Sequence, residues 1–116
     1  MQALEALYVV EFGDVAASGF RNGGVAVLET SRVFGGDSGY FYLGNYEVDR
    51  GVMNAKLKVV KHNPAWANAF GDAANEFEVR LSGAINNGVI NGHMERVDRP
   101  GIKLPIRLTR KAPLPG

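Results

Sequence analysis

The sequence contains no cysteine, which excludes disulfides, thiol nucleophiles and cysteine-based metal sites. It also lacks any run of eighteen apolar residues, the length that a membrane-spanning helix needs. Neither sign of charge dominates, because 13 basic and 12 acidic residues leave a formal net charge of +1. A nearly neutral chain has little electrostatic attraction for nucleic acid or for a membrane. We therefore expect no direct nucleic-acid or membrane partner.

The first residues also lack the features of a signal peptide. The segment MQALEALYVVEF carries Glu5 and has no basic residue before its apolar positions. Together with the absence of cysteine, this favours a cytoplasmic protein. The 116 residues match the usual size of one domain. We predict a single β-barrel domain over residues 1–112, followed by a frayed C-terminal tail over 113–116.

Glycine is abundant where cysteine is absent. The 15 glycines are scattered between short apolar runs, which indicates many short strands joined by tight turns. Turns are expected at Asn22-Gly23, at Gly35-Gly36 and at Asn87-Gly88. One short helix is expected within 62–72, because Asn63 can cap it, Pro64 suits its first position and Gly71 can end it. Strands are expected over 6–12, 25–30, 40–48, 52–61, 76–83, 89–97 and 101–112.

This pattern predicts an all-β fold of seven or eight antiparallel strands with one short helix. Closure into a small barrel removes exposed strand edges and lets one-sided strands bury a common interior. A barrel of about eight strands holds its own side chains or one small ligand. A flattened sandwich of two sheets is the alternative.

The stretch GGDSGYFYLGNYE carries the candidate binding residues. It precedes a strand and has no P-loop lysine, so it is a turn and not a phosphate-binding loop. Strand alternation places Tyr40, Tyr42 and Tyr46 on one face, which we predict to be inside. These tyrosines either pack as core or line a pocket for a small apolar ligand. Phe41 and Leu43 then face outward and suggest the contact surface of a homodimer.

No residue pattern indicates catalysis. The two histidines, His62 and His93, have no spacing typical of a metal site, and no serine lies in a nucleophile-elbow motif. We therefore expect a protein that is not an enzyme, with no catalytic residue, no metal and no cofactor.

The segments LYVVEF, GGVAVLETSRVFGGDSGYFYLGNYE, VKHN and FEVRLSG resemble the GrlR-like family, negative regulators of bacterial type III secretion. The resemblance runs from about Leu7 to Ile106, and its most specific part is the Gly-Gly-Asp turn followed by aromatics and Gly44. It implies a lipocalin-like β-barrel that forms a homodimer. In the best-known member an acidic surface run is linked to the binding of a transcriptional activator. The matching stretch here is VDRG, in which Asp49 is the acid and Arg50 is basic.

The resemblance therefore implies a non-enzymatic regulatory protein that binds a transcriptional regulator, with Glu47, Asp49 and Arg50 as the expected partner contact. The alternative is a lipocalin-like carrier or sensor of a small apolar or amphipathic ligand. These two hypotheses use different parts of a barrel, because the first needs an outer surface and the second needs an interior cavity.

Overall fold

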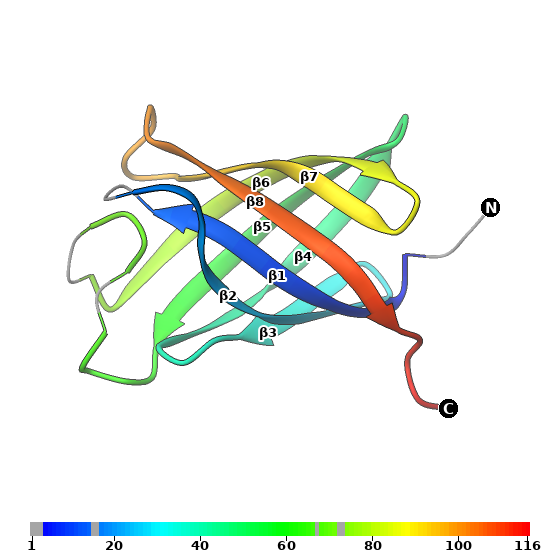
Figure 1. The fold of residues 1–116 in the computed structure, drawn as a ribbon, viewed down its shortest axis with the longest axis horizontal. Helices are drawn as coiled ribbons and strands as arrows, with labels where there is room; N and C mark the ends of the chain where they lie inside the picture. Colours follow the sequence, from blue (N-terminus) through cyan, green and yellow to red (C-terminus); the bar gives the residue numbers. More distant parts are fainter. Residues whose placement is uncertain (1–3, 15–16, 67, 72–73) are drawn as a thin grey trace.

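The computed structural model describes residues 4–14, 17–66, 68–71 and 74–116. These residues form eight antiparallel β-strands in one closed barrel, which confirms the all-β barrel and excludes the flattened sandwich (Figure 1). The strands are β1 (Ala6–Asp14), β2 (Ala17–Glu29), β3 (Arg32–Gly36), β4 (Tyr40–Asp49), β5 (Val52–Lys61), β6 (Glu76–Asn86), β7 (Val89–Arg96) and β8 (Lys103–Ala112).

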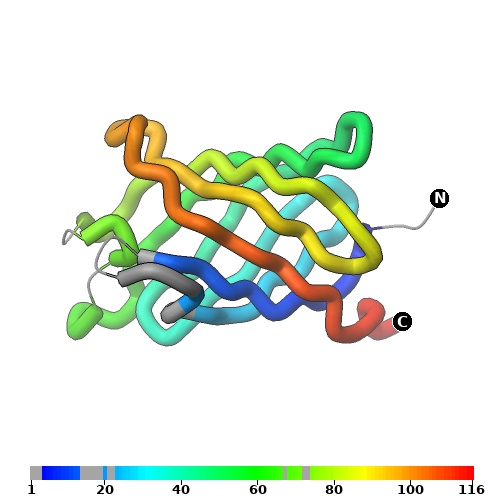
Figure 2. The backbone as a smooth tube through the Cα atoms, turned by 45° about the horizontal axis from the view of Figure 1, so that its top comes forward, coloured from blue at the N-terminus to red at the C-terminus, as the bar shows by residue number. Residues whose placement is uncertain are grey.

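Closure of the barrel depends on the pairing of its first and last strands. Each strand pairs with the next along the chain, and β8 returns to pair with β1, so that Val10 lies opposite Leu108 and Phe12 opposite Ile106. Across this closure the Arg107 guanidinium lies 3.0 Å from the Glu11 carboxylate. Figure 2 shows the start of β1 and the C-terminal tail at one end of the barrel and the described parts of 62–75 at the other.

The predicted short helix is wrong for the residues described within 62–72, which form two separate turns. In the first, the Asn63 carbonyl accepts from the backbone N–H of Trp66 and its side chain accepts from Ala65 N–H. In the second, the Asn68 side-chain oxygen accepts from the backbone N–H of Phe70, and the Asn68 carbonyl accepts from the backbone N–H of Gly71. Asparagine side chains that bind nearby backbone groups compete with helical hydrogen bonds. A segment this short has too few helical bonds to outweigh that competition.

Two predicted turns are also wrong. Asn22 and Gly23 lie inside β2, opposite Phe12 and Glu11, so β2 begins well before the expected strand at 25–30. Gly35 and Gly36 belong to β3, a strand that the sequence did not predict. A Cβ at Gly35 would lie 2.2 Å from the Val25 carbonyl oxygen, so this glycine permits close packing of strands and does not supply a turn.

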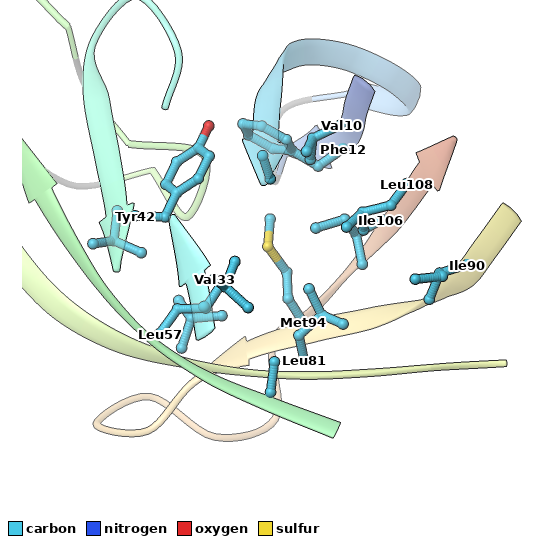
Figure 3. Close-up of a cluster of buried hydrophobic side chains, with 14 of the residues drawn as sticks. Val10, Phe12, Val33, Tyr42, Leu57, Leu81, Ile90, Met94, Ile106 and Leu108 are labelled. Atoms are coloured by element: carbon cyan, nitrogen blue, oxygen red, sulfur yellow. The ribbon is translucent and has the colours of Figure 1, made fainter. Parts of the chain in front are cut away.

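The Asn87-Gly88 turn is confirmed, because both residues have positive φ values of 51° and 79° between β6 and β7. The predicted inward register of β5 is confirmed too. Alternate side chains from Met53 to Val59 are buried, and the lysines between them are exposed. The core occupies the barrel interior, where the labelled side chains converge from opposite walls (Figure 3).

Candidate functional sites: the barrel interior and its outer apolar surface

The β4 tyrosines point toward the barrel axis, as strand alternation predicts. Tyr40 and Tyr42 are buried, with 6% and 9% of their surface exposed, whereas Tyr46 is only partly buried. Tyr40 and Tyr42 line the interior cavity, and Tyr46 lines a separate open depression elsewhere. The structure therefore places two of the three candidate pocket residues together and separates the third.

Asp37 organises the turn before β4. Its Oδ1 accepts hydrogen bonds from the backbone N–H groups of Gly39 (2.9 Å) and Tyr40 (2.8 Å), which is the turn chemistry expected of aspartate. Its Oδ2 accepts a hydrogen bond from the Tyr42 hydroxyl. Burial of the ring, this hydrogen bond and the charge of Asp37 together raise the pKa of Tyr42 far above its usual range. Tyr42 therefore stays protonated and acts as a donor.

The cavity inside the barrel is small. Its volume is about 70 Å³, and its walls come from both halves of the barrel, including Leu57, Leu81, Met94 and Leu108. Ordinary ligand pockets enclose about 300–1,000 Å³. The tyrosines are thus mainly part of a packed core that leaves a space for only a few non-hydrogen atoms.

The end of the cavity near Asp37 is closed by the segment after β5. Asn68, Ala69 and Phe70 line the cavity, and Phe70 is 4% exposed. The Phe70 ring packs edge-on against Phe77 at a centroid distance of 5.9 Å. Arg96 also stacks on Phe77, with its guanidinium carbon 4.5 Å from the Phe77 ring centroid. The first part of the segment is tied to the Asp37 turn, because His62 N–H donates to the Gly39 carbonyl at 2.9 Å.

The outer surface of β1 to β5 carries a group of apolar side chains that we call the outer apolar surface. Leu43 is 49% exposed and Phe41 is partly buried, so both predicted dimer residues point outward. Strand pairing places them in two adjacent rows, one through Val27, Phe34 and Leu43 and one through Val25, Gly36 and Phe41. The full surface consists of Leu7, Val9, Val25, Val27, Phe34, Phe41, Leu43 and Val60.

Sequence reasoning identified only two members of the outer apolar surface. Strand alternation in LYVVEF places Leu7 and Val9 on one face of the strand and Tyr8 and Val10 on the other. The sequence therefore contained a signal for two further members of the outer apolar surface. The others could not be found because β3 was not predicted and because the pairing of β1 with β2 is a property of the fold.

The predicted partner residues lie at the β4–β5 hairpin. Glu47, Asp49 and Arg50 are exposed, and the Arg50 and Asp49 side chains lie 4.0 Å apart with 93% and 84% of their surfaces accessible. Arg50 and Gly51 take positive φ values of 54° and 77° in the tight turn. This hairpin and the Asp37 turn lie at opposite ends of β4 (Figure 1).

Within the described residues, no group of three His, Asp or Glu side chains could hold a metal ion. His62 is occupied by a structural contact, because its Nε2 lies 2.9 Å from the Asp37 carbonyl oxygen. His93 is exposed and lies opposite Ser82 and Pro105 on the outer wall. The described part of the chain contains no helix that is long and apolar enough to cross a membrane.

No protein-family model matches the chain, and a search of curated proteins finds no match either.

Proposed function

We propose that this chain is a non-enzymatic regulatory protein of the GrlR-like type that acts in the bacterial cytoplasm by binding proteins, as a homodimer. The observation that carries this proposal is the outer apolar surface. Eight apolar residues form adjacent rows on neighbouring strands, and among them Val25 and Leu43 are each about half exposed. Monomeric proteins rarely leave such a contiguous group in water.

A second copy of the chain is the partner that best fits this surface. A two-fold interface joins one surface to the same surface of a second copy. Such a surface must therefore be self-complementary, and it must not bring like charges together. The outer apolar surface has no charged side chain among its members; the Arg32–Glu29 pair and Lys58 lie beside it. Large apolar side chains contribute roughly 1.5–3 kcal/mol each on full burial. Two facing copies therefore recover free energy of the same order as the roughly 4–15 kcal/mol cost of association.

The exposed β4–β5 hairpin is the proposed contact for a transcriptional regulator. Glu47, Asp49 and Arg50 present charges of both signs on a tight turn. Charges at the edge of an interface set specificity and association rate more than affinity. The regulator contact and the dimer contact would then occupy different parts of the barrel surface.

The dimer proposal is tested by replacing Phe41 and Leu43 with aspartate. Four carboxylates would face one another across the two-fold axis, so we expect the double variant to be a folded monomer. Light scattering over a range of protein concentrations measures the mass, and far-UV circular dichroism reports the fold.

The matched control is Asn54→Asp with Ser82→Asp. These residues are also exposed on the outer wall, opposite each other on β5 and β6 and away from the outer apolar surface. The control adds the same charge and should remain dimeric. A monomeric wild-type protein, a dimeric Phe41/Leu43 variant or a monomeric control would each contradict the proposal.

The second candidate function is that of a carrier or sensor of a small ligand, which the interior cavity favours. Its volume of about 70 Å³ restricts this role to a ligand much smaller than the long-chain molecules of large barrels.

A further inference from the structure

The cavity is apolar on all sides except one. Among its described lining residues Asp37 is the only charged group, and it lies at the end closed by Phe70 and Asn68. The other walls are mainly aliphatic and aromatic, and Figure 3 shows labelled members of them around the common interior. A molecule in this cavity would therefore meet hydrocarbon along most of its length and one carboxylate at one end.

The Asp37 carboxylate has capacity for one more donor. Two carboxylate oxygens offer about four acceptor positions. Gly39 N–H, Tyr40 N–H and the Tyr42 hydroxyl use three of them. All three partners are neutral donors, so none of them brings a positive charge to the carboxylate.

No described cation neutralises this carboxylate. Asp37 makes no ion pair with any described residue. The nearest basic residues along the adjoining strand are otherwise engaged. Lys61 Nζ lies 5.8 Å from the Tyr40 ring centroid, and the His62 ring contacts the Asp37 backbone carbonyl instead of its carboxylate. A partly buried charge gains most from a partner of opposite charge that also donates a hydrogen bond.

We propose that the cavity binds a short, unbranched alkyl chain that ends in a primary ammonium group, with the ammonium at Asp37. This proposal rests on the carrier role and specifies its ligand. The small cavity volume limits the ligand to a short chain, and the aliphatic walls require that this chain be apolar. The Asp37 carboxylate favours a head group that is positively charged and donates hydrogen bonds. A carboxylate head group is disfavoured, because it would bring two like charges together in a space of low polarity.

Three compounds with the same four-carbon chain test the proposal: n-butylammonium chloride, n-butanol and sodium butyrate. Binding is followed on the methyl NMR signals of Met53 and Met94, which both line the cavity. The fluorescence of Trp66, the single tryptophan, provides a second signal, because this residue packs against Gly39 in the Asp37 turn. We expect butylammonium to bind at least about tenfold more tightly than butanol, as for a charge-assisted hydrogen bond, and butyrate more weakly still.

Asp37→Asn tests the head-group contact, because asparagine keeps an oxygen acceptor for the turn and removes the charge. We expect this variant to lose about tenfold or more in butylammonium affinity and to lose less in butanol affinity, because an uncharged hydroxyl gains less from the carboxylate charge. Measurable butanol binding to the variant would also show that the cavity is intact. The matched control is Asp49→Asn, in which an 84% exposed carboxylate at the other end of β4 is neutralised without effect on binding.

The outcomes separate the ligand from the role. If none of the three compounds shifts the methionine signals, the carrier role itself is wrong. If butanol or butyrate binds as tightly as butylammonium, or if Asp37→Asn leaves butylammonium affinity unchanged, the ammonium site is wrong and the carrier role stands. Should Asp37→Asn fail to fold, the comparison of the three compounds on the native protein still decides the proposal. The dimer proposal is measured separately and is unaffected by either result.

Discussion

Asp37 and Tyr42 show how one side chain can serve both the fold and a candidate site. The Asp37 carboxylate closes the turn before β4 through two backbone N–H groups and also accepts the Tyr42 hydroxyl inside the barrel. The turn role follows from the sequence, because aspartate after glycine commonly binds its own backbone. The contact with Tyr42 does not, because it requires β4 to bring the ring back beside the turn.

The raised pKa of Tyr42 leads to a prediction for alkaline pH. Burial and the Asp37 contact raise this pKa in the folded state, whereas the unfolded chain ionises near the ordinary value of about 10. The stabilisation of the folded state by protonated Tyr42 is therefore complete below pH 10, and it is lost as the pH rises above 10. We expect the free energy of unfolding to fall by up to about 1.4 kcal/mol per pH unit from this residue.

Urea unfolding at several pH values between 8 and 11, for wild type and Tyr42→Phe, measures this effect. At pH 8 the variant should be about 1.5–3 kcal/mol less stable, because a hydrogen bond to a charged group is lost. Its stability should then decline less steeply above pH 10. Equal slopes for the two proteins would show that Tyr42 does not hold its proton as described.

At the level of the secondary-structure elements, alternation between buried and exposed residues is the dominant feature. In β5 and β6 the inward side chains are buried and the outward ones are mostly charged or polar, so each strand has one buried face and one solvent-exposed face. Lysine–glutamate ion pairs connect the solvent-exposed faces of the two strands, with Lys56 Nζ 3.4 Å from Glu78 and Lys58 Nζ 3.2 Å from Glu76. These exposed pairs contribute little to stability, so the fold is stabilised mainly by burial of the inward-facing apolar side chains.

Truncation of side chains on the buried face should therefore lower the free energy of unfolding substantially. Leu57 and Leu81 are 7% and 4% exposed and lie on neighbouring strands. We expect Leu57→Ala and Leu81→Ala each to lower the free energy of unfolding by about 2–5 kcal/mol, through lost burial and the cavity left behind. Chemical denaturation measures the change. Asn54→Ala, at an exposed position of β5, is the control and should remain within about 0.5 kcal/mol of wild type. Similar losses at all three positions would contradict this assignment of faces.

At the level of the whole molecule, closure of the barrel is the decisive feature. β8 pairs with both β7 and β1, so one strand completes two ladders and removes both edges of the sheet. It also contributes Leu104, Ile106 and Leu108 to the core. Pro105 lies opposite His93 on the β7 side and just beyond the last β1 pairing at Ile106, where its missing N–H costs no β1–β8 hydrogen bond.

Removal of residues 103–116 should therefore abolish folding. The three buried side chains alone contribute about 4.5–9 kcal/mol, which is comparable with the roughly 5–15 kcal/mol stability of a whole domain. Far-UV circular dichroism and size-exclusion chromatography should report an unfolded or aggregated chain. Removal of residues 113–116 is the matched control, because β8 ends at Ala112 and the tail is predicted to be frayed. A cooperative unfolding transition in the longer truncation would show that the barrel does not need closure.

Much of the candidate site could be predicted because strand alternation is local. Two adjacent residues of one strand point to opposite faces, and this rule alone separated Tyr40 and Tyr42 from Phe41 and Leu43. The rule does not say which residues of other strands lie beside them. The extension of the outer apolar surface to Val27 and Phe34 therefore required the pairing of β2, β3 and β4.

The sequence by itself determined the all-β class, the antiparallel order and the inward register, because these follow from the two-residue period of a strand and from tight turns such as Asn87-Gly88. Only the tertiary structure decided that Gly35 and Gly36 form strand β3, since the reason is the close approach of β2. It also replaced the expected helix by turns at Asn63 and Asn68, and it joined Asp37 to Tyr42 in one cavity. Such features depend on contacts between segments distant in the chain or on competition among alternative hydrogen bonds, and neither is encoded in local spacing.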